Sequence, residues 1–308
     1  MAEIITHRAA PVKLRFLLTS DCTASCAYCH NEGQAKDKTY LALADIAHVL
    51  NTFAAAGQRV DGIILSGGEP TLHPELAAIA QRAKASGALV SINTHGAHPG
   101  LLERALPWID ELKLHIDSFD PQRQKRSMGL SIDKVLQSIE RSRQYPALRT
   151  VVNHPLQSLH EAREVIATTR ALGVECKFIQ LLDAAQGYPQ LADIPWAELG
   201  YQATAPGFWQ HPGSGHRAMA RRCAATSADI TWFVGADGVR TDLQSASLGA
   251  ARDFSAAMVK TLPAAHPPVR TAPPLRRRPL RPLAAAALPR WRPSPTPRRM
   301  RAAGSCCW

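Results

Sequence analysis

The sequence predicts an α/β fold, a partial (β/α)6 barrel of parallel strands with a small C-terminal β-hairpin cap and a disordered tail. Three observations predict it. Short apolar runs rich in β-branched residues alternate with segments of helical periodicity over residues 14–181. Polar segments follow most of these runs, as they do where loops leave the carboxyl ends of barrel strands. From about residue 262 the chain becomes rich in proline and arginine.

Strands and helices are predicted to alternate. We expect strands at 14–19, 63–66, 89–94, 112–117, 150–153 and 175–181, and helices near 40–57, 73–87, 100–107, 131–144 and 159–172. Ser131 and Ser158 are expected N-caps, and Gly57, Gly87 and Gly173 stand just past helix ends. Strands joined by helices of this length require crossovers, and therefore a parallel sheet. An open doubly wound sheet shows the same alternation, so periodicity alone does not choose the barrel.

The chain is predicted to have three parts. Residues 1–182 form the barrel, 183–261 a substrate cap and 262–308 the tail. In the cap, apolar runs at 230–234 and 239–243 flank the turn Gly235-Ala236-Asp237-Gly238, which predicts a β-hairpin because Asp-Gly turns tolerate positive φ. The Pro- and Arg-rich tail cannot pack a core, so we expect it to be disordered. Its lack of acidic residues and abrupt onset are typical of translation out of frame; a natural basic arm is the alternative.

Charge and hydropathy exclude two classes of partner. The net charge is +11, but the arginines of the tail supply nearly all of it, so the body is nearly neutral and has no phosphate-tracking surface. No apolar run approaches the roughly 20 residues that a transmembrane helix needs. We therefore expect a cytoplasmic protein with neither a nucleic acid nor a membrane as its partner.

Three of the seven cysteines, Cys22, Cys26 and Cys29, lie close together directly after the first predicted strand. In a reducing compartment such a group binds metal or does redox chemistry more often than it forms disulfides. Three thiolates on one loop can hold three irons of a [4Fe–4S] cluster and leave the fourth open to a non-protein ligand. A zinc knuckle with His30 is the alternative, although adjacent Cys29 and His30 fit one tetrahedral ion poorly.

The spacing Cys-x3-Cys-x2-Cys, with Tyr28 before the last cysteine, resembles the signature of the radical S-adenosylmethionine (SAM) superfamily. The resemblance implies one [4Fe–4S] cluster and SAM as cofactors. It also implies that an electron from the cluster cleaves SAM to methionine and a 5′-deoxyadenosyl radical, which abstracts hydrogen from a substrate. A flavodoxin or ferredoxin would donate that electron.

A second motif follows one βα unit later, where Gly67, Gly68, Glu69 and Pro70 end the second predicted strand. Similar Gly-Gly-Glu-Pro motifs in the superfamily contact the amino group of SAM. Glycines let the backbone approach a ligand closely, and an acid or an exposed carbonyl can accept hydrogen bonds from an ammonium group. The position of this motif after the cysteine loop strengthens the resemblance.

The resemblance also implies that later strand ends line the SAM pocket. These candidates are Asn93 and Thr94 after the third strand, Asp117 and Ser118 after the fourth, and Asn153 at the end of the fifth. Asp117 and Ser118 are candidate partners of the ribose hydroxyls. The alternative is that the segment Asp-Ser-Phe-Asp-Pro forms an ordinary turn and helix N-cap.

Residues 14–181 resemble the GTP 3′,8-cyclase group of molybdenum cofactor biosynthesis within that superfamily. Those cyclases bind a second cluster through three C-terminal cysteines, whereas the matching positions here hold Cys223, Thr226 and Asp242. Threonine and aspartate are poor ligands for an iron–sulfur cluster, so we expect one cluster and no basis for assigning GTP.

The resulting hypothesis is a radical SAM enzyme, lyase or cyclase in type, that acts on a nucleoside-, nucleotide- or sugar-type small molecule. Arg15, Lys113, His115 and Arg240 would lie near the mouth of the barrel and could hold an anionic group of that substrate. The alternatives are GTP 3′,8-cyclase itself, a decayed cyclase, and a non-catalytic iron–sulfur redox sensor. A sensor needs no SAM site, and residues 67–70 argue against it.

Overall fold

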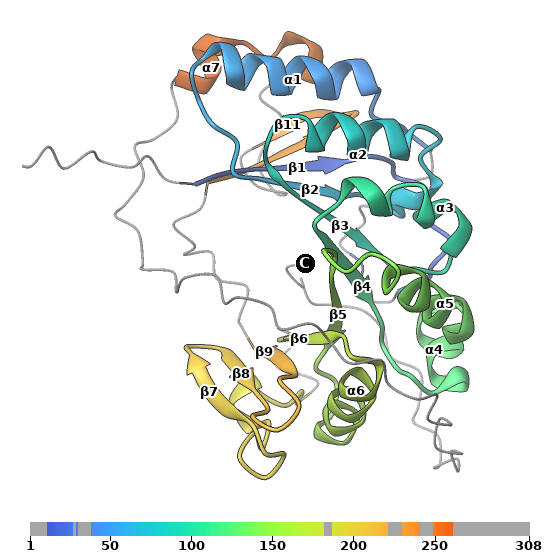
Figure 1. Ribbon diagram of the computed structural model, residues 1–308. Coiled ribbons are helices and arrows are strands. Elements are labelled where there is room, and N and C mark those ends of the chain that lie inside the picture. Colours follow the sequence, from blue (N-terminus) through green and yellow to red (C-terminus); the bar gives the residue numbers. More distant parts are fainter. Residues whose placement is uncertain are drawn as a thin grey trace, which may run out of the picture.

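The strands form one curved, open sheet in the order β11-β10-β1-β2-β3-β4-β5-β6-β9-β8-β7 (Figure 1). The computed structural model describes residues 11–26, 29, 38–181, 187–220, 230–240 and 249–260. Within the described residues, β7 and β11 are the two edges, so the barrel is partial. The predicted class, an α/β partial barrel of parallel strands, is confirmed.

Six parallel strands form the middle of the sheet. They are β1 (Val12–Leu17), β2 (Gly62–Ser66), β3 (Leu89–Thr94), β4 (Glu111–His115), β5 (Arg149–Pro155) and β6 (Glu175–Ile179). Each pairs in parallel with the next along the chain, as the crossover argument requires. All six predicted strands are present, with ends shifted by a few residues.

The connecting helices are α1 (Leu43–Ala55), α2 (Leu76–Lys84), α3 (Pro99–Glu103), α4 (Pro121–Met128), α5 (Ile132–Ser142) and α6 (Leu159–Leu172). Ser158 caps α6 by accepting a hydrogen bond from the Glu161 N–H, whereas Ser131 makes no side-chain cap on α5. Gly57, Gly87 and Gly173 have positive φ, as expected just past helix ends. Helix α4 was not predicted. Short 3-10 helices are η1 (Pro70–Leu72), η2 (Leu106–Trp108), η4 (Leu191–Asp193) and η5 (Ala251–Asp253).

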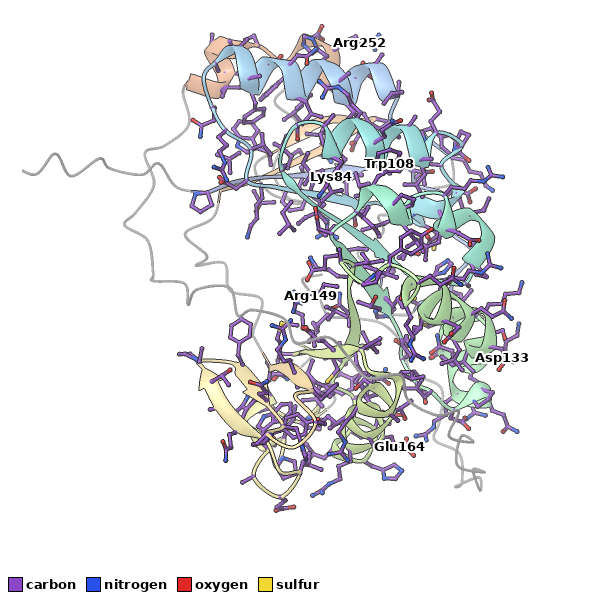
Figure 2. All side chains as sticks on the ribbon, in the orientation of Figure 1. Lys84, Trp108, Asp133, Arg149, Glu164 and Arg252 are labelled. Carbon is purple, nitrogen blue, oxygen red and sulfur yellow. The ribbon has the colours of Figure 1, made fainter. Side chains whose placement is uncertain are left out.

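The sheet has a convex apolar face and a concave polar face. Alternate strand residues such as Leu14, Phe16 and Ile92 are fully buried in one core with the helices, which cover the convex side (Figure 1). Figure 2 shows Arg149 on the inner side of the curved sheet. In the strand register the polar side chains of the concave face include Lys13, Arg15, Ser66, Ser91, Asn93, Glu111, Lys113, His115, Arg149, Asn153, Glu175, Lys177, Arg217, Thr231 and Arg240.

The strands after residue 200 extend the sheet at both edges. β9 (Arg217–Ala220) pairs in parallel with β6, and β8 (Phe208–Gln210) and β7 (Gln202–Ala205) continue from it in antiparallel pairing. The predicted hairpin is present as β10 (Ile230–Gly235) and β11 (Gly238–Arg240), and β10 also pairs in parallel with all of β1. The short helix α7 (Ala256–Lys260) packs against α1.

Some predictions lie outside the described residues. These include Tyr28 of the cysteine signature, His30 of the zinc alternative, the positions 223, 226 and 242 of the second-cluster comparison, and the tail from residue 262. Among the helices that the structure describes, none combines the length and apolar character that crossing a bilayer needs.

Candidate cofactor-binding site

The three cysteines lie on the loop that leaves the carboxyl end of β1. Cys22, Cys26 and Cys29 are free thiols, each partly exposed. Burial raises the pKa of Cys22 to about 11 and raises that of Cys26 as well. A cluster binds thiolates, so its assembly on this loop would release these protons.

Backbone contacts fix the cysteine loop on two sides. Gly68 N–H donates to the Thr19 carbonyl at 2.6 Å and Glu69 N–H donates to the Asp21 carbonyl at 2.7 Å, which joins the loop to the end of β2. On the other side, Ser25 N–H donates to the carbonyl of Met128, the last residue of α4, at 3.0 Å.

The next residue, Gly129, permits a close approach between α4 and the cysteine loop. Gly129 has φ +74°, and a Cβ there would lie 3.2 Å from the Ser25 hydroxyl. Below this contact, Ala24 and Cys26 pack against the buried side chains of Ala97, Met128 and Leu130.

The segment 67–70 approaches the cysteine loop so closely that only glycine fits its first position. Gly67 has φ +124°, and a Cβ on it would lie 2.5 Å from the Thr19 carbonyl oxygen. Pro70 opens η1 and is buried. This backbone therefore passes beside the cysteine loop with no side chain between them.

The Glu69 carboxylate is fully buried and binds its own chain. Its Oε1 accepts from Thr71 N–H at 3.0 Å, from the Thr71 hydroxyl at 2.6 Å and from the Thr94 hydroxyl at 2.6 Å, and its Oε2 accepts from His95 N–H at 2.9 Å. Burial alone would raise the pKa of Glu69, but His95 and these hydrogen bonds hold it below its ordinary value. The side chains of Glu69 and Thr94 thus join the end of β2 to the end of β3.

Asn93 and Asn153 are placed differently. Their side chains lie on the concave face of β3 and β5, on either side of β4 in the strand register. The Oδ1 atom of each is buried and accepts no hydrogen bond from any residue that the structure describes. An unpaired buried acceptor costs stability unless a ligand satisfies it, so these atoms fit a pocket for a hydrogen-bond donor such as SAM.

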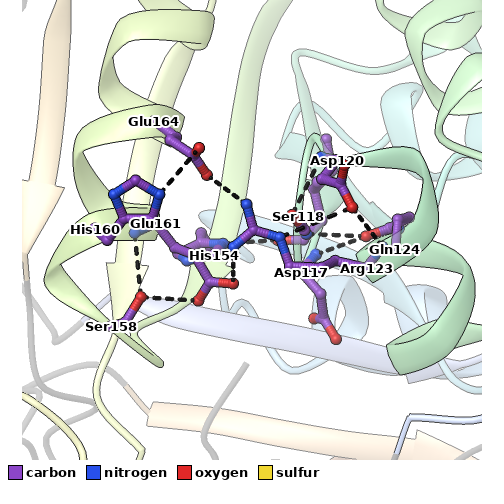
Figure 3. A network of polar contacts seen from close by, with 11 residues as sticks. Asp117, Ser118, Asp120, Arg123, Gln124, His154, Ser158, His160, Glu161 and Glu164 are labelled. Carbon is purple, nitrogen blue, oxygen red and sulfur yellow. Dashed lines mark hydrogen bonds and ion pairs between the residues drawn. The ribbon is translucent and has the colours of Figure 1, made fainter. Parts of the chain in front are cut away.

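The segment after β4 forms the turn and N-cap that the sequence left as an alternative (Figure 3). The Ser118 hydroxyl accepts from Asp120 N–H at 3.1 Å, and Asp120 caps α4 by accepting from Arg123 N–H at 2.7 Å. Asp117 Oδ1 lies 3.0 Å from His115 Nε2. The Ser118 hydroxyl therefore already serves the turn, whereas Asp117 faces a residue of the concave surface.

Gln124 holds that turn and is a residue the sequence gave no reason to select. It is fully buried, and its Oε1 accepts from the N–H groups of Asp117 and Ser118 at 3.1 and 3.0 Å. Its amide nitrogen lies 3.2 Å from the sulfur of Met128. A polar side chain four residues after an N-cap aspartate, on a helix without apolar periodicity, is the only signal that could have indicated it.

Four side chains were predicted near the barrel mouth as an anion site. Arg15 donates to the Ser66 hydroxyl at 2.9 Å and lies over the ring of Phe233. Lys113 pairs with Glu111 at 2.7 Å, His115 with Asp117, and Arg240 with Asp237 at 2.6 Å. All four lie on strands of the concave face, since Arg15 of β1 and Arg240 of β11 both align with Phe233 of β10.

Comparison with known families gives a match over residues 16–172, just over half of the chain, to the Radical SAM superfamily. Among curated proteins, a probable GTP 3′,8-cyclase of Pyrococcus horikoshii is 28% identical over 143 residues, 45% of this chain and 46% of that protein. A GTP 3′,8-cyclase of Haemophilus influenzae is 26% identical over 186 residues, 56% of this chain and 54% of that protein. The chain thus spans about half the length of the curated relatives it matches.

Solved structures share the fold. Streptococcus suis SuiB bound to S-adenosylmethionine superposes with a TM-score of 0.64 at 11% identity, covering 83% of this chain and 67% of that one. Native anSMEcpe with bound AdoMet gives a TM-score of 0.62 at 15% identity, covering 82% of this chain and 81% of that one. At these identities the likeness concerns the arrangement of the backbone.

Proposed function

The chain belongs to the radical SAM superfamily, with a [4Fe–4S] cluster and SAM as its cofactors, and we propose that it uses them to abstract hydrogen from an anionic small molecule of the nucleoside, nucleotide or sugar type. One observation carries the proposal. The cysteine loop and the close-packed segment 67–70 follow the carboxyl ends of β1 and β2, and the two unsatisfied asparagine oxygens lie on β3 and β5 of the same parallel sheet.

Each residue then has a defined task. Cys22, Cys26 and Cys29 would hold the cluster through their thiolates. The backbone of 67–70 accepts from the SAM amino group, and Asn93 and Asn153 accept from other donors of the cofactor. The cluster and SAM would together supply the one-electron chemistry that abstracts hydrogen from the substrate.

The substrate's charge is inferred from the concave face. Basic side chains outnumber acidic ones there, because Lys13, Arg15, Lys113, Arg149, Lys177 and Arg217 are opposed by Glu111 and Glu175. Such a surface attracts an anion, and salt and water screen this attraction less on a concave surface than on a flat one. We place the substrate's anionic group within reach of Arg15, Lys113 and His115, on the concave face that the strands after residue 200 extend at both edges.

GTP 3′,8-cyclase is the second candidate, because several curated relatives carry that name. Positions 223, 226 and 242 argue for one cluster rather than two, since only Cys223 is a thiol. The electron donor we expect is a flavodoxin or ferredoxin.

Anaerobic reconstitution separates the candidates. About four irons per chain, with 5′-deoxyadenosine formed from SAM and dithionite, supports one cluster and a radical enzyme. About eight irons per chain would indicate two clusters and support GTP 3′,8-cyclase. About four irons without SAM cleavage would support the redox sensor. Cys26→Ala should abolish the iron–sulfur absorption, whereas Cys176→Ala, which removes a buried thiol of β6, should retain it.

A further inference from the structure

The hydroxyl of Thr23, between Cys22 and Cys26, contacts two histidines that follow β3. Thr23 Oγ1 lies 3.1 Å from His95 Nε2 and 3.0 Å from His98 Nε2. The two imidazole rings lie 5.3 Å apart between centroids. The cysteine loop is therefore joined through one side chain to a loop that follows it by more than one βα unit.

His95 is itself fixed by two further contacts. Its Nδ1 accepts from Ala97 N–H at 3.0 Å, so the neutral ring carries its proton on Nε2. That Nε2–H points between the Thr23 hydroxyl and Glu69 Oε2, which lies 3.2 Å away. His95 is only 5% exposed, so its ring has little freedom to turn.

One consistent set of donors satisfies this group. His95 Nε2–H donates to Thr23 Oγ1 and Glu69 Oε2, and the Thr23 hydroxyl donates to His98 Nε2. The Glu69 carboxylate in turn binds Thr71 and the end of β3. The side chains of Thr23, Glu69 and His95 thus connect the loops after β1, β2 and β3, in addition to the backbone hydrogen bonds described above.

We propose that this Thr23–His95 link positions the cysteine loop before the cluster arrives, so that the thiols meet the metal in a preformed arrangement. The inference rests on the proposed function. A preformed loop loses less conformational entropy on binding the cluster, and so holds it more tightly. Side chains that orient metal ligands in this way change metal affinity by about 10- to 100-fold when removed.

Three variants test the link. Thr23→Val keeps the shape of the side chain and removes the hydroxyl, Thr23→Ser keeps the hydroxyl, and Thr204→Val makes the same change on β7, whose Thr204 is exposed. Hydrogen exchange is measured in the metal-free protein on a peptide spanning the cysteine loop. Loss of iron to a chelator is measured on the reconstituted protein.

We expect Thr23→Val to exchange the loop amides and to lose iron about 10-fold faster, while Thr23→Ser and Thr204→Val match the wild type. Equal exchange in Thr23→Val and the wild type overturns the inference. The exchange experiment needs no cluster, so it remains decisive even if the wild type binds no iron, a result that would instead refute the proposed function.

Discussion

The polar side chains near the strand ends fall into two groups, those that hydrogen-bond to other residues of the chain and those with an unpaired oxygen. Glu69 is bound on both oxygens by Thr71, Thr94 and His95, whereas the Oδ1 atoms of Asn93 and Asn153 are buried and accept nothing from the described residues. The sequence could predict that polar residues gather there. It could not predict which of them would form hydrogen bonds within the protein, because their partners come from other strands and are brought close only by the fold.

Removing the charge of Glu69 should destabilise the fold. In Glu69→Gln an amide N–H2 group faces donors such as His95 N–H, so at least one buried contact is lost. We expect the free energy of unfolding to fall by about 2 kcal/mol in urea denaturation. The matched variant Glu75→Gln changes an exposed residue that makes no cap on α2 and should have no effect. Equal stability of both variants would contradict the role assigned to Glu69.

Acid should weaken the fold through His154. This fully buried ring donates from Nδ1 to the Ile116 carbonyl, and burial lowers its pKa from 6.5 to about 4. Between those two pKa values the unfolded chain binds more protons than the folded one. The contribution of neutral His154 to the free energy of unfolding is therefore fully present above about pH 6.5 and is lost as the pH falls toward about 4.

The measurement is urea denaturation of the metal-free protein at about pH 7.5 and about pH 5. His154→Phe keeps a ring beside Phe178 and should flatten the pH dependence by up to about 1.4 kcal/mol per pH unit. Burial also lowers the pKa of His216 to about 4, so in the His154→Phe variant His216 would still contribute to the pH dependence of stability. An identical slope in the variant and the wild type would refute this account of His154.

At the scale of elements, helix α4 connects two parts of the candidate site. Its N-terminal end is capped by Asp120 and holds the turn after β4 through Gln124, and its last carbonyl, that of Met128, accepts from Ser25 in the cysteine loop. The sequence did not reveal α4 because its buried side chains are only Gln124 and Met128, which make no apolar period. The caps, Asp120-Pro121 at the start and Gly129 at the end, were the available signal.

Substitution of Gln124 should therefore weaken SAM binding without removing the cluster. Gln124→Met has nearly the same size but cannot accept from Asp117 and Ser118 N–H. We expect the dissociation constant for SAM to rise about 10-fold, read from the change that SAM causes in the cluster's EPR spectrum, with iron content unchanged. Gln122→Met on the exposed side of α4 is the control. A parallel loss of iron would show that Gln124 acts on the cluster loop instead.

At the scale of the whole molecule, the strand order was only partly predictable. The six strands followed from alternation and crossover rules, and the hairpin of β10 and β11 followed from its Asp-Gly turn. The parallel pairing of β10 with β1 joins residues more than two hundred positions apart, and no local pattern encodes such a contact. Strands β7 to β9 are three or four residues long, too short for a periodic signal.

Two truncations test which C-terminal residues the fold needs. Residues 1–260 retain β10, whose Trp232 packs against Phe53 and Phe254, whereas residues 1–220 lose all of these contacts. We expect 1–260 to match the full chain in melting temperature and SAM cleavage, and 1–220 to unfold, since losing one such tryptophan alone costs about 3–5 kcal/mol. A destabilised 1–260 would show that the predicted disordered tail contributes to the fold.

The pairing of β1 between β2 and β10 also determines when the protein can finish folding during synthesis. One neighbour of β1 emerges from the ribosome early, while the other is made only once residue 235 has been translated. Until then the strand that leads into Cys22 has an open edge on the nascent chain. Pairing of β10 with β1 therefore completes the sheet beside the cysteine loop only late in synthesis, and a nascent chain that ends before residue 230 lacks that support.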